Sequence, residues 1–262
     1  MTGREGYGGA PAGRTRLRRV AALMVLLALW EMLSRVGWLD PFYAPSPTAV
    51  GRVIGTLFAD PDFWTHLRAT FVAAFAGLLG GLLLGVLLGF AAALSPLLAD
   101  LLEPVMILLN AIPRVILAPL FVIWLGIDLA SKVALALILV TVLIFFAVYG
   151  GIKEVDQRLV ERVRTLGGGR RVLIREVYVP SVTAWVMGNL KIAVGFAFTG
   201  AVVGEFVASS LGLGYLLQFA QSTYNAALTI ALIVLIMAFV LVLFAAAERL
   251  ERHLLRWRYG PG

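Results

Sequence analysis

Long runs of uncharged residues alternate along this chain with short segments rich in arginine. Apolar residues make up 61% of the 262 residues and charged residues only 14%, whereas soluble domains are about 45–50% apolar with glycine included. A run of about 20 apolar helical residues crosses the hydrocarbon core of a bilayer. Because no water there can satisfy free backbone groups, such runs have to be helical. The predicted fold class is therefore an all-α membrane protein.

Six predominantly apolar runs are long enough to cross, which predicts six transmembrane helices. They lie near residues 20–38, 69–94, 104–125, 132–150, 183–207 and 227–247. The serines, glycines, glutamines and asparagine between the fifth and sixth runs suit a surface or re-entrant segment better than a further crossing. The predicted organisation is an N-terminal tail, a transmembrane domain and a C-terminal tail, at residues 1–19, 20–250 and 251–262; the first 13 residues are expected to be disordered.

The distribution of basic residues predicts the orientation. With six crossings, three arginine-rich segments share one side of the membrane, at residues 4–19, 153–175 and 249–258. The positive-inside rule then places both termini in the cytoplasm. The same rule explains the net charge of +7. Since the basic residues form no aromatic-interleaved patch, the expected partner is the lipid membrane and not a nucleic acid.

The sequence lacks the residues that several kinds of chemistry require. There is no cysteine, and the only histidines, His66 and His253, fall on opposite sides of the predicted membrane. We therefore predict no metal site and no catalytic residues. A P-loop needs Gly-Lys-Ser/Thr, and no lysine here follows a glycine. We expect no enzyme activity and no cofactor bound by this chain, so a partner has to supply the energy for any active transport.

Ionisable and amide side chains inside the apolar runs are candidates for a translocation path. Arg114 lies in the third run among three prolines, with Asn110 one turn before it. An ionisable residue at that depth is expected to face the protein interior. Arg114 either lines a path that attracts an anionic or polar group, or it snorkels or makes a structural pair. Glu205 and Lys191 lie in the fifth run. For both, structural partners elsewhere and a role in the path stay open.

The segment after the fourth run, residues 153–180, is predicted to be a folded cytoplasmic loop. Asp156 can cap a helix starting at Gln157, and the three glycines 167–169 supply its C-terminal turn. A second short helix is expected from Arg170 towards Val179. Pro180 restricts the residue before it and is expected to mark the return to the bilayer.

The spacing of Glu161, Gly167 and Pro180 in this loop resembles a known sequence motif. Five residues separate Glu161 from Gly167, and a further nine separate Gly167 from the closing Val177-x-Val179-Pro180. This pattern resembles the EAA loop of permease subunits of bacterial ATP-binding-cassette (ABC) importers, with both alanines of that motif replaced, by Arg162 and Val163. Further segments look like the subfamily that handles nitrate, sulfonates and taurine: Tyr43-Ala-Pro-Ser-Pro, the run Ile112–Gly126, Arg164-Thr-Leu-Gly167, and Gly204-Glu205 followed by Gly212-Leu-Gly214.

The resemblance implies a type I importer permease in a bacterial inner membrane. Two such subunits would form the pore, either two copies of this chain, which is the expected arrangement, or this chain with a paralogue. Two ATPase subunits, carrying ATP and magnesium, would dock on the loops, and a solute-binding protein would deliver the substrate. The residues it implies for contact with the ATPase are Glu161, Arg162, Val163, Thr165, Leu166, Gly167, Gly168, Arg170 and Arg171.

The predicted function is thus the permease subunit of an ATP-driven importer of a small solute. The alternatives are a secondary transporter or channel that does not use ATP, and an integral membrane enzyme. A secondary transporter usually contains inverted repeats, which are not apparent here, and an enzyme needs clustered acid–base or metal-binding residues. The substrate is not defined by the sequence, although Arg114 favours an anion.

Overall fold

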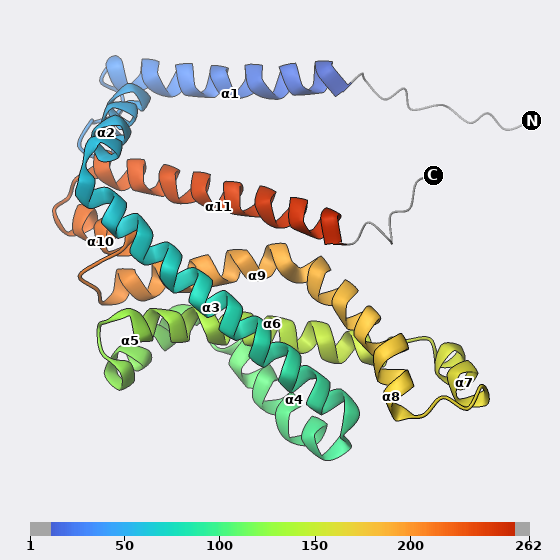
Figure 1. Ribbon diagram of the computed structural model, residues 1–262. Helices are drawn as coiled ribbons and strands as arrows, with labels where there is room; N and C mark the ends of the chain where they lie inside the picture. The colour runs from blue at the N-terminus through green and yellow to red at the C-terminus, as the bar shows by residue number, and fades with distance from the viewer. Residues whose placement is uncertain (1–11, 255–262) are drawn as a thin grey trace, which may run out of the picture. The chain divides into compact units, whose positions relative to one another are not determined.

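A computed structural model describes residues 12–254 of the chain, which form helices and no strand (Figure 1). The prediction of an all-α membrane fold is confirmed. The chain divides into two compact units. The first comprises the residues up to 59 together with 220–231, and the second comprises 60–219 and the residues from 232 onwards.

Two helices, α1 (Ala12–Arg35) and α2 (Pro47–Ala59), make up most of the first unit. Glu31 of α1 pairs with Arg35 one turn later, at 2.7 Å between Oε1 and Nε. The same carboxylate accepts hydrogen bonds from the backbone N–H of Thr48 at 3.0 Å and from its hydroxyl at 2.9 Å. Glu31 thereby satisfies a free N–H in the first turn of α2 and fixes where that helix begins.

The first predicted span lies in α1, but the helix is short for a crossing. It ends at Arg35, three residues before the predicted end, and its basic N-terminal part extends to Arg19. The stretch between, residues 20–35, is about 24 Å long, less than the ~30 Å of hydrocarbon. The helix starts at Ala12, inside the predicted N-terminal tail, while the remainder of that tail, residues 1–11, lies outside the described residues.

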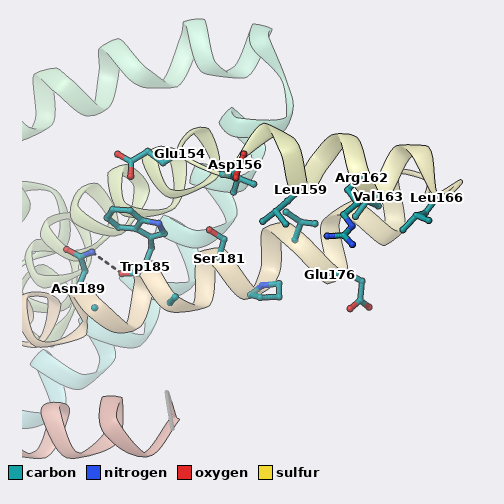
Figure 2. Close-up of a pocket in the computed structure, with 15 residues that line it drawn as sticks. Glu154, Asp156, Leu159, Arg162, Val163, Leu166, Glu176, Ser181, Trp185 and Asn189 are labelled. Carbon is teal, nitrogen blue, oxygen red and sulfur yellow. Dashed lines mark hydrogen bonds between the residues drawn. The ribbon is translucent and has the colours of Figure 1, made fainter. Parts of the chain in front are cut away.

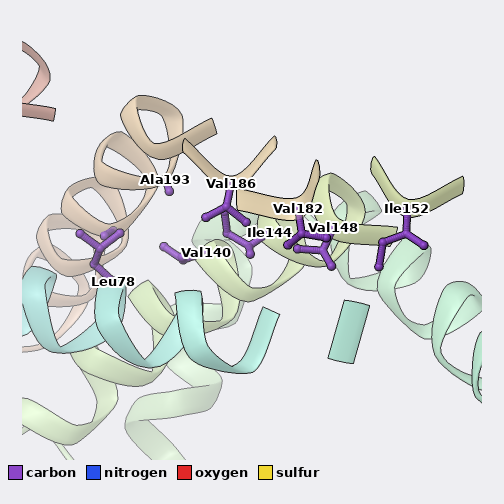
Figure 3. Packing of buried hydrophobic residues seen from close by; sticks show 9 residues of the cluster. Leu78, Val140, Ile144, Val148, Ile152, Val182, Val186 and Ala193 are labelled. Carbon is purple, nitrogen blue, oxygen red and sulfur yellow. The ribbon is translucent and has the colours of Figure 1, made fainter. Parts of the chain in front are cut away.

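Three long helices form the centre of the second unit: α3 (Pro61–Leu94), α6 (Leu129–Lys153) and α9 (Val179–Val207). Each packs against the other two. Asp60 begins α3 by accepting the N–H of Asp62 at 2.9 Å, with Pro61 at the first helical position. Their shared core is aliphatic (Figure 3), and it contains Leu78, Val140, Ile144, Val148, Ile152, Val182, Val186, Ala193 and Ala197.

Small residues let these backbones approach closely. A Cβ at Gly85 would lie 2.7 Å from the Cβ of Ile144 and 2.9 Å from the carbonyl oxygen of Thr141. The same contact repeats every turn, so Gly77, Gly81, Gly85 and Gly89 of α3 face Ala136, Val140, Ile144 and Val148 of α6. The small residues that recur at every fourth position of α3 therefore form a packing seam inside one subunit.

The third predicted span is not a single straight helix. It consists of α4 (Pro96–Ala111) and α5 (Arg114–Leu125), whose axes differ in direction by 109°. The break falls at Ile112 and Pro113, which both have extended backbone angles. Proline disfavours helix in the preceding residue and lacks the N–H that would continue the helix, so a sharp bend divides the span that was predicted over residues 104–125.

The chain ends in α10 (Leu213–Ser222) and α11 (Ala226–Leu254). At about 15 Å, α10 is too short to cross, which agrees with a surface or re-entrant segment. Four helices of the described residues are long and apolar enough to cross a membrane: α3, α6, the continuous helix Arg170–Val207, and α11; the bent pair α4–α5 makes a fifth if it is one span. The predicted count of six therefore depends on the shorter α1.

Replacing Gly85 by alanine tests the packing seam. We expect Gly85→Ala to push α3 away from α6 and to lower the free energy of unfolding by about 1–3 kcal/mol, the usual cost of overpacking. The control is Gly150→Ala in α6, because a Cβ at Gly150 meets no atom within 4 Å and alanine favours helix. Thermal unfolding in detergent, followed by tryptophan fluorescence, should show a lower midpoint for Gly85→Ala only. Equal midpoints would contradict the seam.

Candidate functional site

The predicted loop begins with a capped helix, α7 (Gln157–Thr165). The Asp156 carboxylate accepts the N–H of Arg158 at 2.9 Å, so Asp156 is the N-cap that the sequence predicts. Val160 is buried, whereas Leu159 and Leu166 expose 51% and 80% of their surfaces. The apolar stripe of α7 is thus only partly covered by the chain itself.

A Schellman turn ends α7. The N–H of Gly168 bonds to the carbonyl of Val163 at 2.8 Å, and the N–H of Gly167 bonds to that of Arg164 at 2.9 Å, which is the pair of bonds that defines this motif. Gly167 has φ of +79°, a conformation that side chains with a Cβ rarely adopt. Gly168 is required for a different reason, because a Cβ there would come within 2.8 Å of the Val163 carbonyl oxygen.

The chain then enters the bilayer without a break. The short helix α8 (Arg170–Leu173) continues through the π-helical turn η1 (Ile174–Tyr178) into α9. The expected boundary at Pro180 is wrong, since Val179 has helical angles, φ −61° and ψ −47°. A π turn widens the helix and changes its hydrogen-bond register; such local adjustments let transmembrane helices accommodate proline. The second helix of the loop and the fifth span are one continuous helix.

The residues implied to contact an ATPase gather on this α7–α8 hairpin. Two of them, Val163 and Gly168, are partly buried inside the turn. Thr165 donates its hydroxyl to the carbonyl of Glu161 at 2.9 Å, within α7. The other seven residues of the set are exposed: Glu161, Arg162, Thr165, Leu166, Gly167, Arg170 and Arg171.

A groove of about 830 Å³ separates α7 from the start of α9. Figure 2 shows Leu159, Arg162 and Leu166 reaching from α7 towards it, with Trp185 at the α9 side. The side-chain amide of Asn189 donates a hydrogen bond to the carbonyl oxygen of Trp185 at 2.9 Å. The groove mixes an apolar floor with charges of both signs, contributed by Glu154, Asp156, Arg162 and Glu176.

The structure describes the surroundings of two of the three residues predicted to line a translocation path. Asn110 is exposed near the end of α4. Arg114 begins α5, but its side chain lies outside what the structure describes. Glu205 is 1% exposed and accepts hydrogen bonds from Thr70 and Gly214. For Glu205, the structural partners that the sequence left open are present.

Lys191 also has structural partners. Its ammonium lies 4.0 Å from the Glu248 carboxylate and 5.5 Å from the centre of the Phe244 ring, both on α11. Asn189 of the groove, and Thr70 as a partner of Glu205, were not predicted to belong to a site. Both lie in apolar runs, where a single polar residue does not indicate a site. Gly214, the other partner of Glu205, belongs to the segment Gly212-Leu-Gly214 that carries part of the resemblance. Within residues 12–254 there is no group of three His, Asp or Glu side chains that could hold a metal ion.

Residues 81–256, which contain this hairpin and the helices α6, α9 and α10, match the family model described as "Binding-protein-dependent transport system inner membrane component". The chain belongs to this family. It is a permease subunit of an ABC importer, as the spacing within the loop indicates.

Curated relatives and solved structures agree with this assignment. The chain is 35% identical to the riboflavin transport system permease protein RibX of Chloroflexus aurantiacus, over 90% of this chain and 88% of the relative. It is 32% identical to the putative aliphatic sulfonates transport permease protein SsuC of Escherichia coli, over 88% of each chain. The fold resembles a chain of an amino acid ABC transporter, with a TM-score of 0.62 and 18% identity over 78% of this permease and 97% of that chain.

Proposed function

We propose that the α7–α8 hairpin of this permease is its coupling element, on which an ATPase subunit docks from the cytoplasm. The observation that carries the proposal is the continuity of α8, η1 and α9. A push on α8 is delivered directly to a helix that crosses the bilayer, because no break separates α8 from α9. ATP-driven closure of two ATPase subunits would tilt α9 and change which side of the pore is open.

The hairpin offers the surface that such docking needs. Leu159 and Leu166 are exposed apolar side chains next to several arginines. A groove on the partner would bury the two leucines and present acceptors to the arginines. The chain carries no Gly-Lys-Ser/Thr sequence, which supports the assignment of ATP and magnesium to the ATPase subunits. This chain would bind no cofactor and catalyse no reaction.

The remaining parts of the proposal concern assembly and orientation. Arginine is concentrated in the N-terminal segment, the hairpin and the C-terminal segment, which supports cytoplasmic termini in a bacterial inner membrane. One chain holds one hairpin, so two ATPase subunits require a second permease subunit, for which we propose a second copy of this chain. A solute-binding protein on the opposite side would deliver the solute.

For the substrate, we propose a small anionic solute that passes Arg114. The relatives' names include riboflavin and aliphatic sulfonates, so family membership alone does not select a chemistry. A guanidinium in the third span is costly to keep in lipid, and attraction of an anion in the path would explain why it is there. Asn110, one turn before it, would provide a neutral hydrogen-bonding group, whereas the buried position of Glu205 fits a supporting role better.

Substitutions at the turn test the coupling element. In the reconstituted complex, we expect Gly167→Val to lower the solute taken up per ATP hydrolysed by about tenfold, because ~1–2 kcal/mol of backbone strain would oppose the docked turn. Glu161→Lys should act in the same direction by altering the exposed face. Uptake and ATP hydrolysis are measured on the same proteoliposomes.

The matched control is Gly169→Ala, since Gly169 has φ of −78° and a Cβ there meets no atom within 4 Å. It should keep normal coupling. Normal uptake per ATP in both Gly167→Val and Glu161→Lys would contradict the proposal. So would uptake by the purified permease in liposomes without an ATPase, which is the behaviour of a secondary transporter or channel.

The role of Arg114 is tested with a short alkyl sulfonate as the probe anion. We expect Arg114→Gln to raise the half-saturation concentration for uptake by about tenfold or more, the loss expected when a charged hydrogen bond is removed. Arg114→Lys keeps the positive charge and should lie closer to the unmodified protein. Unchanged affinity and rate in Arg114→Gln would remove this residue from the path.

A further inference from the structure

The first turn of α10 has its free N–H groups satisfied by side chains of other helices. A helix N-terminus leaves these groups without intrahelical partners. Here the N–H of Gly212, just before α10, donates to His66 Nδ1 at 3.0 Å. The N–H of Leu213 donates to the Thr70 hydroxyl at 2.8 Å, and that of Gly214 to Glu205 Oε2 at 2.9 Å. Three consecutive N–H groups are therefore capped by α3 and α9.

Thr70 and Glu205 are themselves joined. The Thr70 hydroxyl donates to Glu205 Oε2 at 2.8 Å while accepting from Leu213. Thr70 is fully buried and Glu205 is 1% exposed, so these bonds form away from water, where a lost partner is costly. A carboxylate also suits this place because the N-terminal end of a helix dipole is positive.

Glycines allow the close approach. Gly212 has φ of +117°, and a Cβ on it would overlap the Glu205 carboxyl group. A Cβ on Gly214 would lie 2.7 Å from the Cβ of Glu205. His66 adds a stacked contact with Tyr215, at 5.5 Å between ring centres. We call this set, formed by His66, Thr70, Glu205 and residues 212–215, the α10 latch.

A buried lysine lies beside the latch. Lys132 of α6 is 5% exposed and packs against Gly204, where a Cβ would lie 3.2 Å from its Cα. It is therefore a neighbour of Glu205 in the next helix, and a buried charge is tolerated where an opposite charge and hydrogen bonds compensate it. The Oε1 oxygen of Glu205 has no hydrogen-bond partner among the described residues, so Oε2 carries the bonds to Thr70 and Gly214.

We propose that Glu205 is a positioning residue of the transport cycle, which through the latch makes the start of α10 move with α9. This inference rests on the proposed function, because α9 is the helix that the coupling hairpin would drive. The hairpin joins α9 at Val179, and Glu205 lies near the other end, about 39 Å along the helix. Movement imposed at one side of the membrane would reach the segment 208–214 at the other.

A single label tests this inference, since the chain has no cysteine. Ser210, which is exposed, is changed to cysteine and given a nitroxide label in the complex with its ATPase subunits. Spectra are recorded without nucleotide and after trapping with ATP and vanadate. In the Ser210→Cys parent we expect the label to change mobility on trapping, because α10 follows α9.

In Thr70→Val the side chain keeps nearly the same shape but loses the hydroxyl, and with it the bonds to Glu205 and Leu213. We expect it to increase the mobile fraction of the label by about tenfold, the change that loss of a hydrogen bond to a charged group produces. The response to trapping should be lost while ATP hydrolysis continues. Thr70→Ser keeps the hydroxyl and should behave like the parent.

Glu205→Gln is the second variant, used if Thr70→Val does not fold. It keeps the size and an acceptor for Gly214 but replaces charge-assisted bonds with weaker neutral ones, so its mobile fraction should be larger than that of the parent and its response to trapping smaller. The inference is overturned if the variant that folds keeps the parent's mobility and trapping response, or if the parent itself shows no response. Failure of the proposed function is recognised separately, by normal coupling in Gly167→Val and Glu161→Lys.

Discussion

The close approach of α6 to both α3 and α9 is the contact on which the rest of the structure depends. Lipid is as apolar as the side chains, so no hydrophobic force draws these helices together, and many small dispersion contacts replace it. Ala136 is fully buried, and a Cβ on either Gly77 of α3 or Gly200 of α9 would overlap this residue. Glycines on two neighbours therefore let α6 serve as the centre of the unit, and they fix the position of α9 relative to it.

Because α9 is packed in this way along its length, each of its two ends connects a different element to the centre of the unit. At one end it continues into η1 and α8, so the α8 arm of the exposed hairpin extends a packed helix without a break. At the other end Glu205 holds the first turn of α10. A helix that tilts as a rigid body transmits displacement over its whole length, whereas a broken or frayed helix would absorb it. The π turn before Pro180 matters for this reason, since it allows a proline without a hinge.

The parts that follow from local rules were predictable from the sequence. Asp156 as a cap, Gly167 as the left-handed residue of the turn and the small-residue stripe of α3 all depend on residues a few positions apart. The rule for prolines predicted a boundary at Pro180 but could not foresee the π turn, and it did not predict how sharply Pro113 bends the third span. The latch was out of reach, because Thr70 and Glu205 are separated by 135 positions and nothing near either residue indicates the other.

The two departures from the Glu-Ala-Ala pattern have different physical consequences. Val163 is partly buried and lies against Gly168, where a Cβ would come within 2.5 Å of its Cγ1. Valine is larger than the alanine of the motif, and the turn accommodates it because Gly168 has no side chain. Arg162 is exposed and lines the groove, so it changes the surface that a docking subunit would meet. A partner that fits this hairpin has to present an acceptor for a guanidinium at that point, because burying an unpaired charge there would cost more than the surrounding apolar contacts return.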